Sequence, residues 1–203
     1  MIKNQKASTF RKTDEKIVNA LITIGAKKSL SKITVSDITK LVKINRGTFY
    51  LHYSDKDTLI ESIENHFTQK IEKQLSGVME EIMVVDLNPL DPHPQLINLF
   101  RILNQNSQSL LVLMGQNGDP KFISTFYDLL EKNLLARIIQ IKGEVKVIPT
   151  IPVDYVIHIV ISEIIDIIQY WLRKENAISE EAITDIIVRT RLLSPYQLLN
   201  FEA

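Results

Sequence analysis

The stretch ITVSDITKLVKINRGTFYLHYSDKDTLIESI, residues 33–63, decides the fold of this chain. Its apolar residues have helical spacing in two short segments that flank a tight connection at Lys43 and Ile44, and a long helix follows directly. Thr34 and Asn45 can cap the two short helices, because their side-chain oxygens accept hydrogen bonds from exposed first-turn amides. Two short helices joined in this way are typical of a helix-turn-helix, which inserts its second helix into the major groove of DNA.

The start of that second helix carries side chains suited to the edges of bases. Arg46 can bond guanine with two hydrogen bonds, Asn45 can do the same to adenine, and the methyl group of Thr48 can contact thymine. Gly47 has no side chain and would allow a close approach to DNA. We therefore expect these four residues to set the sequence preference.

A second group of polar residues is suited to the phosphate backbone, which fixes register without carrying sequence information. Thr34 and Ser36 lie in the first turn of the preceding helix, where free amides and the helix dipole favour an anion. Tyr50, His52 and Lys56 follow the base-reading residues. We expect all five to contact phosphates, although each alone is also a common surface residue.

The segments Ile33-Thr-Val-Ser-Asp-Ile, Arg46-Gly-Thr-Phe-Tyr-Leu-His-Tyr and Asp55-Lys-Asp-Thr-Leu-Ile resemble, in order and spacing, the signature of the TetR family of bacterial transcription regulators. The resemblance covers about 50 residues, Thr13 to Ile63. It implies an all-helical homodimer with about nine helices per subunit, of which the first three bind DNA and the last two dimerise.

A weaker resemblance lies near the carboxyl end. The segments QYWLRKEN (169–176) and ISEE (178–181) are similar to a subgroup that includes the dihydroxyacetone-kinase activator. That resemblance implies a body that binds a kinase-like protein, whereas most relatives bind a small molecule.

Charge is distributed unevenly along the chain. Residues 1–56 hold 12 Lys and Arg against 4 Asp and Glu, whereas the whole chain is neutral with 24 of each sign. Basic side chains gain affinity by displacing counterions from phosphates, so the basic segment is the part expected to meet a polyanion. The alternative is an ordinary solvated basic surface.

Apolar periodicity and punctuation predict an all-α fold with two domains, a DNA-binding domain at 1–54 and an effector-binding and dimerisation domain at 55–203. Helices are expected at Thr13–Lys28, from Val35, from Asn45 to near Tyr53, and along a long stripe from Ile60 to Ile82. Prolines break the pattern at 86–94 and 149–152. Further helices are expected at about 94–105, 107–116, 119–142, 153–175 and 179–193.

The helix expected from Val153 is apolar over more than half its circumference, apart from one narrow polar stripe, and must be covered on two sides. A second subunit could cover one side and form a four-helix interface; burial within one monomer is the alternative. The residues expected at the dimer interface are Ile161, Ile164, Ile165, Ile168, Trp171, Ile183, Ile187 and Thr190.

An effector pocket is expected between the long fourth helix and the helices at 94–142, because the fourth helix joins the two domains. The expected ligand-facing residues are Phe67, Phe100, Leu103, Met114, Phe126 and Leu130, for each of which core packing is the alternative. We expect a ligand-responsive repressor that binds a near-palindromic double-stranded DNA operator as a homodimer. The alternatives are an activator or co-regulator controlled by a protein partner, and an interaction module that no longer reads DNA.

Composition excludes other classes. The apolar fraction of 45% and charged fraction of 24% are ordinary for a soluble globular protein, and the absence of cysteine excludes disulfides and thiolate metal sites. The amino terminus lacks the apolar core of a signal peptide, which favours a cytoplasmic location. The apolar segment 153–172 holds four polar or charged residues that oppose a membrane span, namely Asp154, His158, Glu163 and Asp166.

Catalytic patterns are also missing. Asp154 and His158 share a helical face, and Glu61, Glu64 and His66 lie close together in sequence, but neither set repeats the motif of a di-metal bundle. The sequence has no glycine loop for phosphates and no nucleophile elbow. We therefore expect no enzyme activity, no cofactor and no metal site, and a core or interface role for His158.

Overall fold

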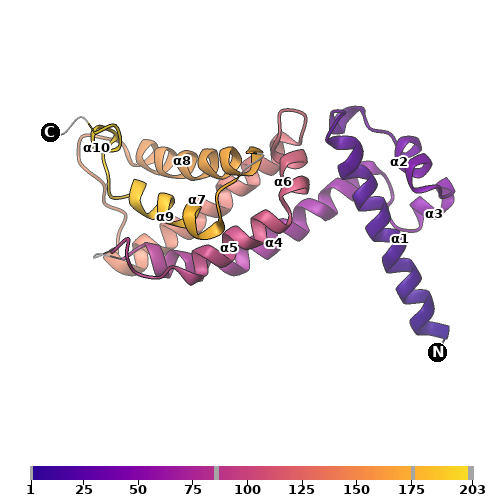
Figure 1. Ribbon diagram of the computed structural model, residues 1–203, viewed down its shortest axis with the longest axis horizontal. Coiled ribbons are helices and arrows are strands. Elements are labelled where there is room, and N and C mark those ends of the chain that lie inside the picture. Colours follow the sequence, from indigo (N-terminus) through magenta and orange to yellow (C-terminus); the bar gives the residue numbers. More distant parts are fainter. Residues whose placement is uncertain (1, 85–86, 175–176, 201–203) are drawn as a thin grey trace. The chain divides into compact units, whose positions relative to one another are not determined.

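A computed structural model describes residues 2–84, 87–174 and 177–200, and within these ranges the chain is helical without any strand (Figure 1). The helices are α1 (Ile2–Gly25), α2 (Val35–Val42), α3 (Arg46–Tyr50), α4 (Lys56–Ile82), α5 (Pro94–Gln105), α6 (Ser107–Met114), α7 (Pro120–Lys142), α8 (Val153–Arg173), α9 (Glu180–Thr190) and α10 (Pro195–Leu198), with a 3-10 turn η1 (Leu30–Lys32). The expected all-α fold is confirmed.

The chain divides into two compact units. The head unit consists of Met1–Thr68 and Gln108–Ile123, and the body unit of Gln69–Ser107 and Ser124–Ala203. This structural division lies inside α4, and it adds most of α6 to the head, whereas the sequence suggested a functional boundary after residue 54. Long-range packing causes the difference, because residues 108–123 return to the first helices.

Fully buried side chains from four helices form the centre of the head unit: Ile17 and Leu21 of α1, Ile38 of α2, Phe49 of α3 and Leu59 of α4. The segment around α6 is tied to the same unit, since the Leu30 amide donates to the Asn117 carbonyl at 3.0 Å. Gly25 lies so close to Val112 that a Cβ at this position would come within 2.5 Å of its side chain. The end of α1 therefore needs glycine for packing.

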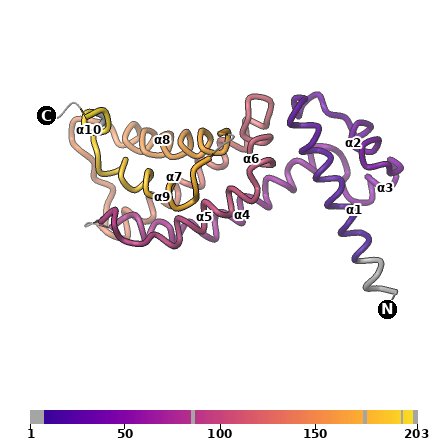
Figure 2. The backbone as a smooth tube through the Cα atoms, in the orientation of Figure 1, coloured from indigo at the N-terminus to yellow at the C-terminus, as the bar shows by residue number. Residues whose placement is uncertain are grey.

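The second part of α4 and helices α5, α7, α8 and α9 each contribute buried residues to the body unit; Figure 2 shows the path of these helices. Phe100 packs edge-on against Trp171, with ring centroids 5.4 Å apart, and the Trp171 indole N–H donates to the Ile178 carbonyl at 2.8 Å. Asn104 donates to Glu180 at 2.8 Å, joining α5 to the start of α9. These contacts fix α9 beside α5 and α8.

Among the described residues, α8 alone is long and apolar enough to cross a membrane by length and composition. Its Ile157, Ile161, Ile165 and Ile168 are buried in the body unit. A core position thus explains the apolar residues on one side of α8, whereas Tyr155, Ile159 and Tyr170 are exposed.

Several helix boundaries differ from the sequence-based expectations. The first helix begins at Ile2 rather than Thr13, and the third ends at Tyr50 rather than Tyr53, because His52 and Tyr53 both donate to the Phe49 carbonyl in a turn. The short elements η1 and α10 were not expected, so the described residues contain ten α-helices rather than nine. Asp86 of the proline-rich break and Glu175 and Asn176 of the weaker resemblance lie outside the described residues.

Candidate nucleic-acid interface

A capping box starts α2. Thr34 Oγ1 accepts from the Asp37 amide at 3.2 Å, and the Asp37 carboxylate accepts from the Thr34 amide at 3.0 Å and from Lys28 Nζ at 2.8 Å. The hydrogen bond from Lys28, followed by those from Thr34, lowers the pKa of Asp37 to about 2. Thr34 is exposed and Ser36 half-buried at this helix start. The Asp37 carboxylate therefore already complements the positive end of α2.

The tight connection between α2 and α3 depends on one left-handed residue. Lys43 has φ 60° and ψ 48°, and its amide donates to the Thr39 carbonyl, as does that of Ile44. Asn45 then caps α3, since its Oδ1 accepts from the Gly47 amide at 3.0 Å. The second lone pair of this oxygen can accept a further hydrogen bond.

The expected base-reading residues lie together at the start of α3. Asn45, Arg46 and Gly47 are exposed and Thr48 is half-buried. Within the described part of the chain, the guanidinium of Arg46 takes part in no hydrogen bond or ion pair. A Cβ at Gly47 would meet only the Asn45 side chain, at 3.8 Å, so packing inside the head unit does not require glycine there. This end of α3 is accessible to an external partner.

The end of α3 and the turn after it are arranged differently. The His52 side chain is only 3% exposed; its Nδ1 lies 3.2 Å from Asp14 Oδ1, and its ring stacks on Phe10 at 3.8 Å. Burial, followed by a hydrogen bond with Asp14, raises the pKa of the neighbouring Tyr53 to about 12. Asp14 thus joins two consecutive residues of the turn to α1, whereas the expected phosphate contact requires an accessible His52.

Lys56 is also engaged within the head unit. Its Nζ donates to the carbonyls of Leu30 at 2.9 Å and Ser31 at 3.3 Å, and its side chain is 17% exposed. It therefore holds η1 against the start of α4. Tyr50, by contrast, is 54% exposed and remains accessible.

Asp14 and Phe10 were missed by sequence reasoning. They lie four residues apart on α1 and therefore share one helical face, which was the available signal. Their partner lies 38 residues further along the chain from Asp14, so only the fold shows the contact.

Most of the expected dimer residues face inward. Ile161, Ile165, Ile168, Trp171, Ile183 and Ile187 are all at most 7% exposed within their own unit, whereas Ile164 and Thr190 are half-buried. The six buried residues pack in the core of their own unit, because apolar periodicity identifies a buried face without naming what covers it. Their contact with a second copy stays a prediction. The apolar residues that α8 and α9 expose are Val153, Tyr155, Ile159, Tyr170 and Ile186.

The expected ligand-facing residues divide between the units. Phe100, Leu103, Phe126 and Leu130 line an apolar cavity of about 30 Å³ in the body unit, which also contacts α4, α8 and α9. Phe67 and Met114 are buried residues of the head unit. A cavity of this volume has room for about one water molecule, so a larger ligand would require the helices to move.

His158 is exposed rather than buried. Its Nδ1 lies 2.9 Å from the Tyr127 hydroxyl and its Nε2 lies 3.4 Å from the Ser162 hydroxyl. Within the residues that the structure covers, no group of three or more His, Cys, Asp or Glu side chains is placed to hold a metal ion.

Comparison with known proteins identifies two family regions. Residues 17–63 match the model described as bacterial regulatory proteins, tetR family, and residues 90–191 match a model described as transcriptional regulator C-terminal region. The second match alone covers half of the chain.

Curated relatives include the uncharacterized HTH-type transcriptional regulator YxbF of Bacillus subtilis (strain 168), 24% identical over 84% of this chain and 42% of its own length. The probable acrEF/envCD operon repressor of Escherichia coli (strain K12) is 27% identical over 51% of each protein. The chain thus spans about half, or less, of the length of these relatives.

Solved structures with a similar fold include a TetR transcriptional regulator from Streptococcus agalactiae 2603V, with TM-score 0.62 and 24% identity over 93% of this chain and 98% of that one. The dihydroxyacetone kinase operon activator DhaS aligns with TM-score 0.53 and 20% identity over 89% of this chain and 94% of its own. At these identities the likeness establishes a shared fold.

Proposed function

Because the chain belongs to the TetR family of DNA-binding transcription regulators, we propose that it binds a near-palindromic operator as a homodimer, represses transcription there, and is released by an effector. The observation that carries this proposal is the contrast between the first residues of α3, which are exposed, and Phe49, His52 and Tyr53, which are buried inside the head unit. A reading surface on a rigid support is what base recognition needs.

Arg46 is the proposed principal base contact, with Asn45, Gly47 and Thr48 beside it. Two copies of α3 would enter successive major grooves about 34–36 Å apart, which requires half-sites one helical turn apart. Thr34, Ser36 and Tyr50 are the proposed phosphate contacts. We assign His52 and Lys56 to positioning, since their side chains are already bonded within the head unit.

The proposed dimer uses the outward face of α8 and α9. Tyr155, Ile159 and Tyr170 are each more than half exposed on α8, and Ile186 is 40% exposed on α9. Burying such apolar side chains against a second copy is favourable. Ile164 and Thr190 are half-buried between α8 and α9 and keep their proposed interface role.

The proposed effector site is the apolar cavity of the body unit, with Phe100, Leu103, Phe126 and Leu130 as contacts. An effector would act only through unequal affinity for DNA-competent and DNA-incompetent states. A cytoplasmic location is part of the proposal, since the operator is genomic DNA.

An activator controlled by a protein partner is the second candidate. The fold shared with the operon activator DhaS favours it, whereas the likeness to the acrEF/envCD operon repressor favours repression. A reporter placed behind a selected operator separates the two: deletion of the regulator raises expression for a repressor and lowers it for an activator.

Duplex binding is tested by selecting sequences from a random pool with the full chain, then titrating a selected duplex at several salt concentrations. Affinity should fall about a thousandfold or more between about 50 and 200 mM salt if six or more phosphates are contacted. A flat salt dependence would exclude the DNA-binding mode proposed for this chain.

A further inference from the structure

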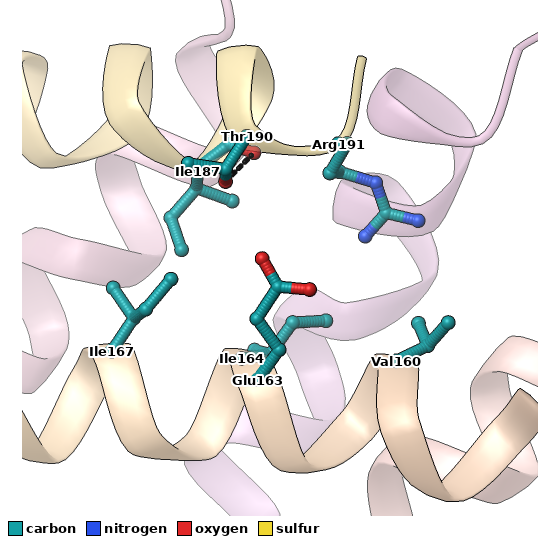
Figure 3. A pocket seen from close by; sticks show the side chains of 7 residues that line it. All are labelled: Val160, Glu163, Ile164, Ile167, Ile187, Thr190 and Arg191. Atoms are coloured by element: carbon teal, nitrogen blue, oxygen red, sulfur yellow. Dashed lines mark hydrogen bonds between the residues drawn. The ribbon is translucent and has the colours of Figure 1, made fainter. Parts of the chain in front are cut away.

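A pocket of about 160 Å³ opens between α8 and α9 in the body unit (Figure 3). Its aliphatic wall consists of Val160, Ile164, Ile167 and Ile187. Its polar groups are Glu163 on α8 and Thr190 and Arg191 at the end of α9. The pocket adjoins the apolar cavity proposed for an effector, since Ile164 and Ile187 line both, but the lining of that cavity contains no charged residue.

Arg191 contributes a guanidinium whose hydrogen-bonding capacity is largely unused. Its Nη2 donates to the Met83 sulfur at 3.3 Å, and within the described residues this weak acceptor is its one hydrogen-bond partner. Burial lowers the pKa of Arg191, while the charge of Glu163 acts in the opposite direction. A desolvated guanidinium is stabilised by a carboxylate, which can accept two parallel hydrogen bonds.

Glu163 supplies the opposite charge. In Figure 3 its carboxylate extends from α8 toward the side of the pocket formed by Thr190 and Arg191. Within the described part of the chain, Glu163 and Arg191 are not close enough to form an ion pair. The two charges therefore lie apart across one pocket, and their sum is zero.

This arrangement selects among small ligands. An anion would be attracted by Arg191 but repelled by Glu163, and a cation would be attracted by Glu163 but repelled by Arg191. A molecule that carries an ammonium and a carboxylate group on the same carbon, with a branched aliphatic group beside them, matches the polar groups and the isoleucine wall together. A cavity of about 150 Å³ holds a benzene molecule, so a compact amino acid has a suitable size.

We propose that the pocket between α8 and α9 binds a free α-amino acid with a branched aliphatic side chain, its carboxylate on Arg191, its ammonium on Glu163 and its alkyl group against Ile164, Ile167 and Ile187. Thr190 Oγ1, which donates to the Ile187 carbonyl at 3.1 Å, can accept a second hydrogen bond from the ammonium group. The site does not depend on operator binding.

Calorimetric titration of the full chain with L-valine, without DNA, tests the proposal. Saturable binding below about 10 mM is expected. Isovalerate and isobutylamine, which each lack one of the two charges, should bind at least about tenfold more weakly. Absence of saturation by L-valine, or equal binding of all three compounds, would overturn the proposal without requiring any variant.

Variants then locate the site. Arg191→Gln and Glu163→Gln should each weaken L-valine binding at least about tenfold. Arg189→Gln is the matched control, because Arg189 lies two residues away, is exposed and bonds Asp185 on its own helix at 2.7 Å. Unchanged affinity in both pocket variants, with a normal circular dichroism spectrum, would contradict the assignment.

A second copy of the chain is the competing occupant. Sedimentation equilibrium of the same variants separates the two cases. If the pocket holds a side chain of the second copy, Arg191→Gln weakens self-association and L-valine does not bind, and this combination would refute the amino-acid site. The proposal expects L-valine binding whether or not the variants change self-association.

Discussion

The two ends of α3 differ in what holds their side chains. At the start, Arg46 and Gly47 are exposed, and the packing of the head unit does not require either residue. Near the end, Tyr50 is 54% exposed, but Phe49 is fully buried, and His52, just after the helix, is stacked on Phe10 and bonded to Asp14. The comparison separates residues that are accessible for contacts with DNA from residues that fix the position of α3, although all of them lie within one short motif.

The largest effect should come from the holding end. Phe49→Ala removes a ring with no exposed surface and should lower the free energy of unfolding by about 3–5 kcal/mol. Tyr50→Ala is the matched control, since Tyr50 is 54% exposed and should change stability by less than about 1 kcal/mol. Urea unfolding, monitored by circular dichroism, measures the stability of both variants. An equal loss of stability in the two variants would contradict the difference between Phe49 and Tyr50.

At the reading end, Arg46→Ala should weaken binding to a selected duplex by about 1–3 kcal/mol, because a two-bond contact with guanine is lost. The thermal midpoint should stay unchanged, since Arg46 is exposed and makes no hydrogen bond within the described residues. Fluorescence anisotropy and a melting curve measure the two quantities. A fall in the thermal midpoint would show that Arg46 stabilises the head unit.

Asp14→Asn tests whether the contact of Asp14 with His52 fixes the position of the turn after α3. The variant keeps the shape of the side chain but loses the charged acceptor 3.2 Å from Nδ1, so stability should fall by about 1 kcal/mol. Operator affinity should fall in parallel. Glu15→Gln, a neighbouring exposed carboxylate, serves as control; if both variants bind DNA as the wild type does, Asp14 has no positioning role.

A smaller effect, dependent on pH, is expected from Glu64 of α4. The buried Oε1 atom of Glu64 has no hydrogen-bond partner within the described residues. Burial, followed by the charges of Asp119 and Glu61, raises the pKa of the Glu64 carboxyl to about 7. Since the folded-state pKa lies above the ordinary value of 4.5, the stabilising contribution is complete below about pH 4.5 and is lost as the pH rises through about 7.

Glu64→Gln should therefore remove a decline in stability that the wild type shows between about pH 5 and 8. Urea unfolding at these two pH values measures it. Identical pH dependence in the two proteins would show that the Glu64 carboxyl is solvated in the folded state.

Local sequence was sufficient for the starts of α2 and α3 and for the family. Thr34 and Asn45 were predicted as caps, and each accepts an amide hydrogen bond of its own helix. These contacts span two or three residues, so spacing alone identifies them.

Contacts between distant residues could not be predicted in this way. His52 and Lys56 have side chains suited to phosphate, but their partners lie 38 and 26 residues away in the sequence. Likewise, the apolar pattern of α8 predicts that two sides are covered, but it does not distinguish the side facing its own unit from the outward side that carries Tyr155 and Ile159.

Our central claim is that residues at the start of α3 recognise bases, whereas Phe49 and His52 fix the helix in the head unit. The most direct test selects binding sites from a random duplex pool with Arg46→Ala and Asp14→Asn in parallel. Arg46→Ala should lose preference at one base pair of each half-site, whereas Asp14→Asn should keep the wild-type preference at every position with lower overall affinity. An unchanged preference with Arg46→Ala, or a preference altered at specific positions with Asp14→Asn, would contradict this division of α3.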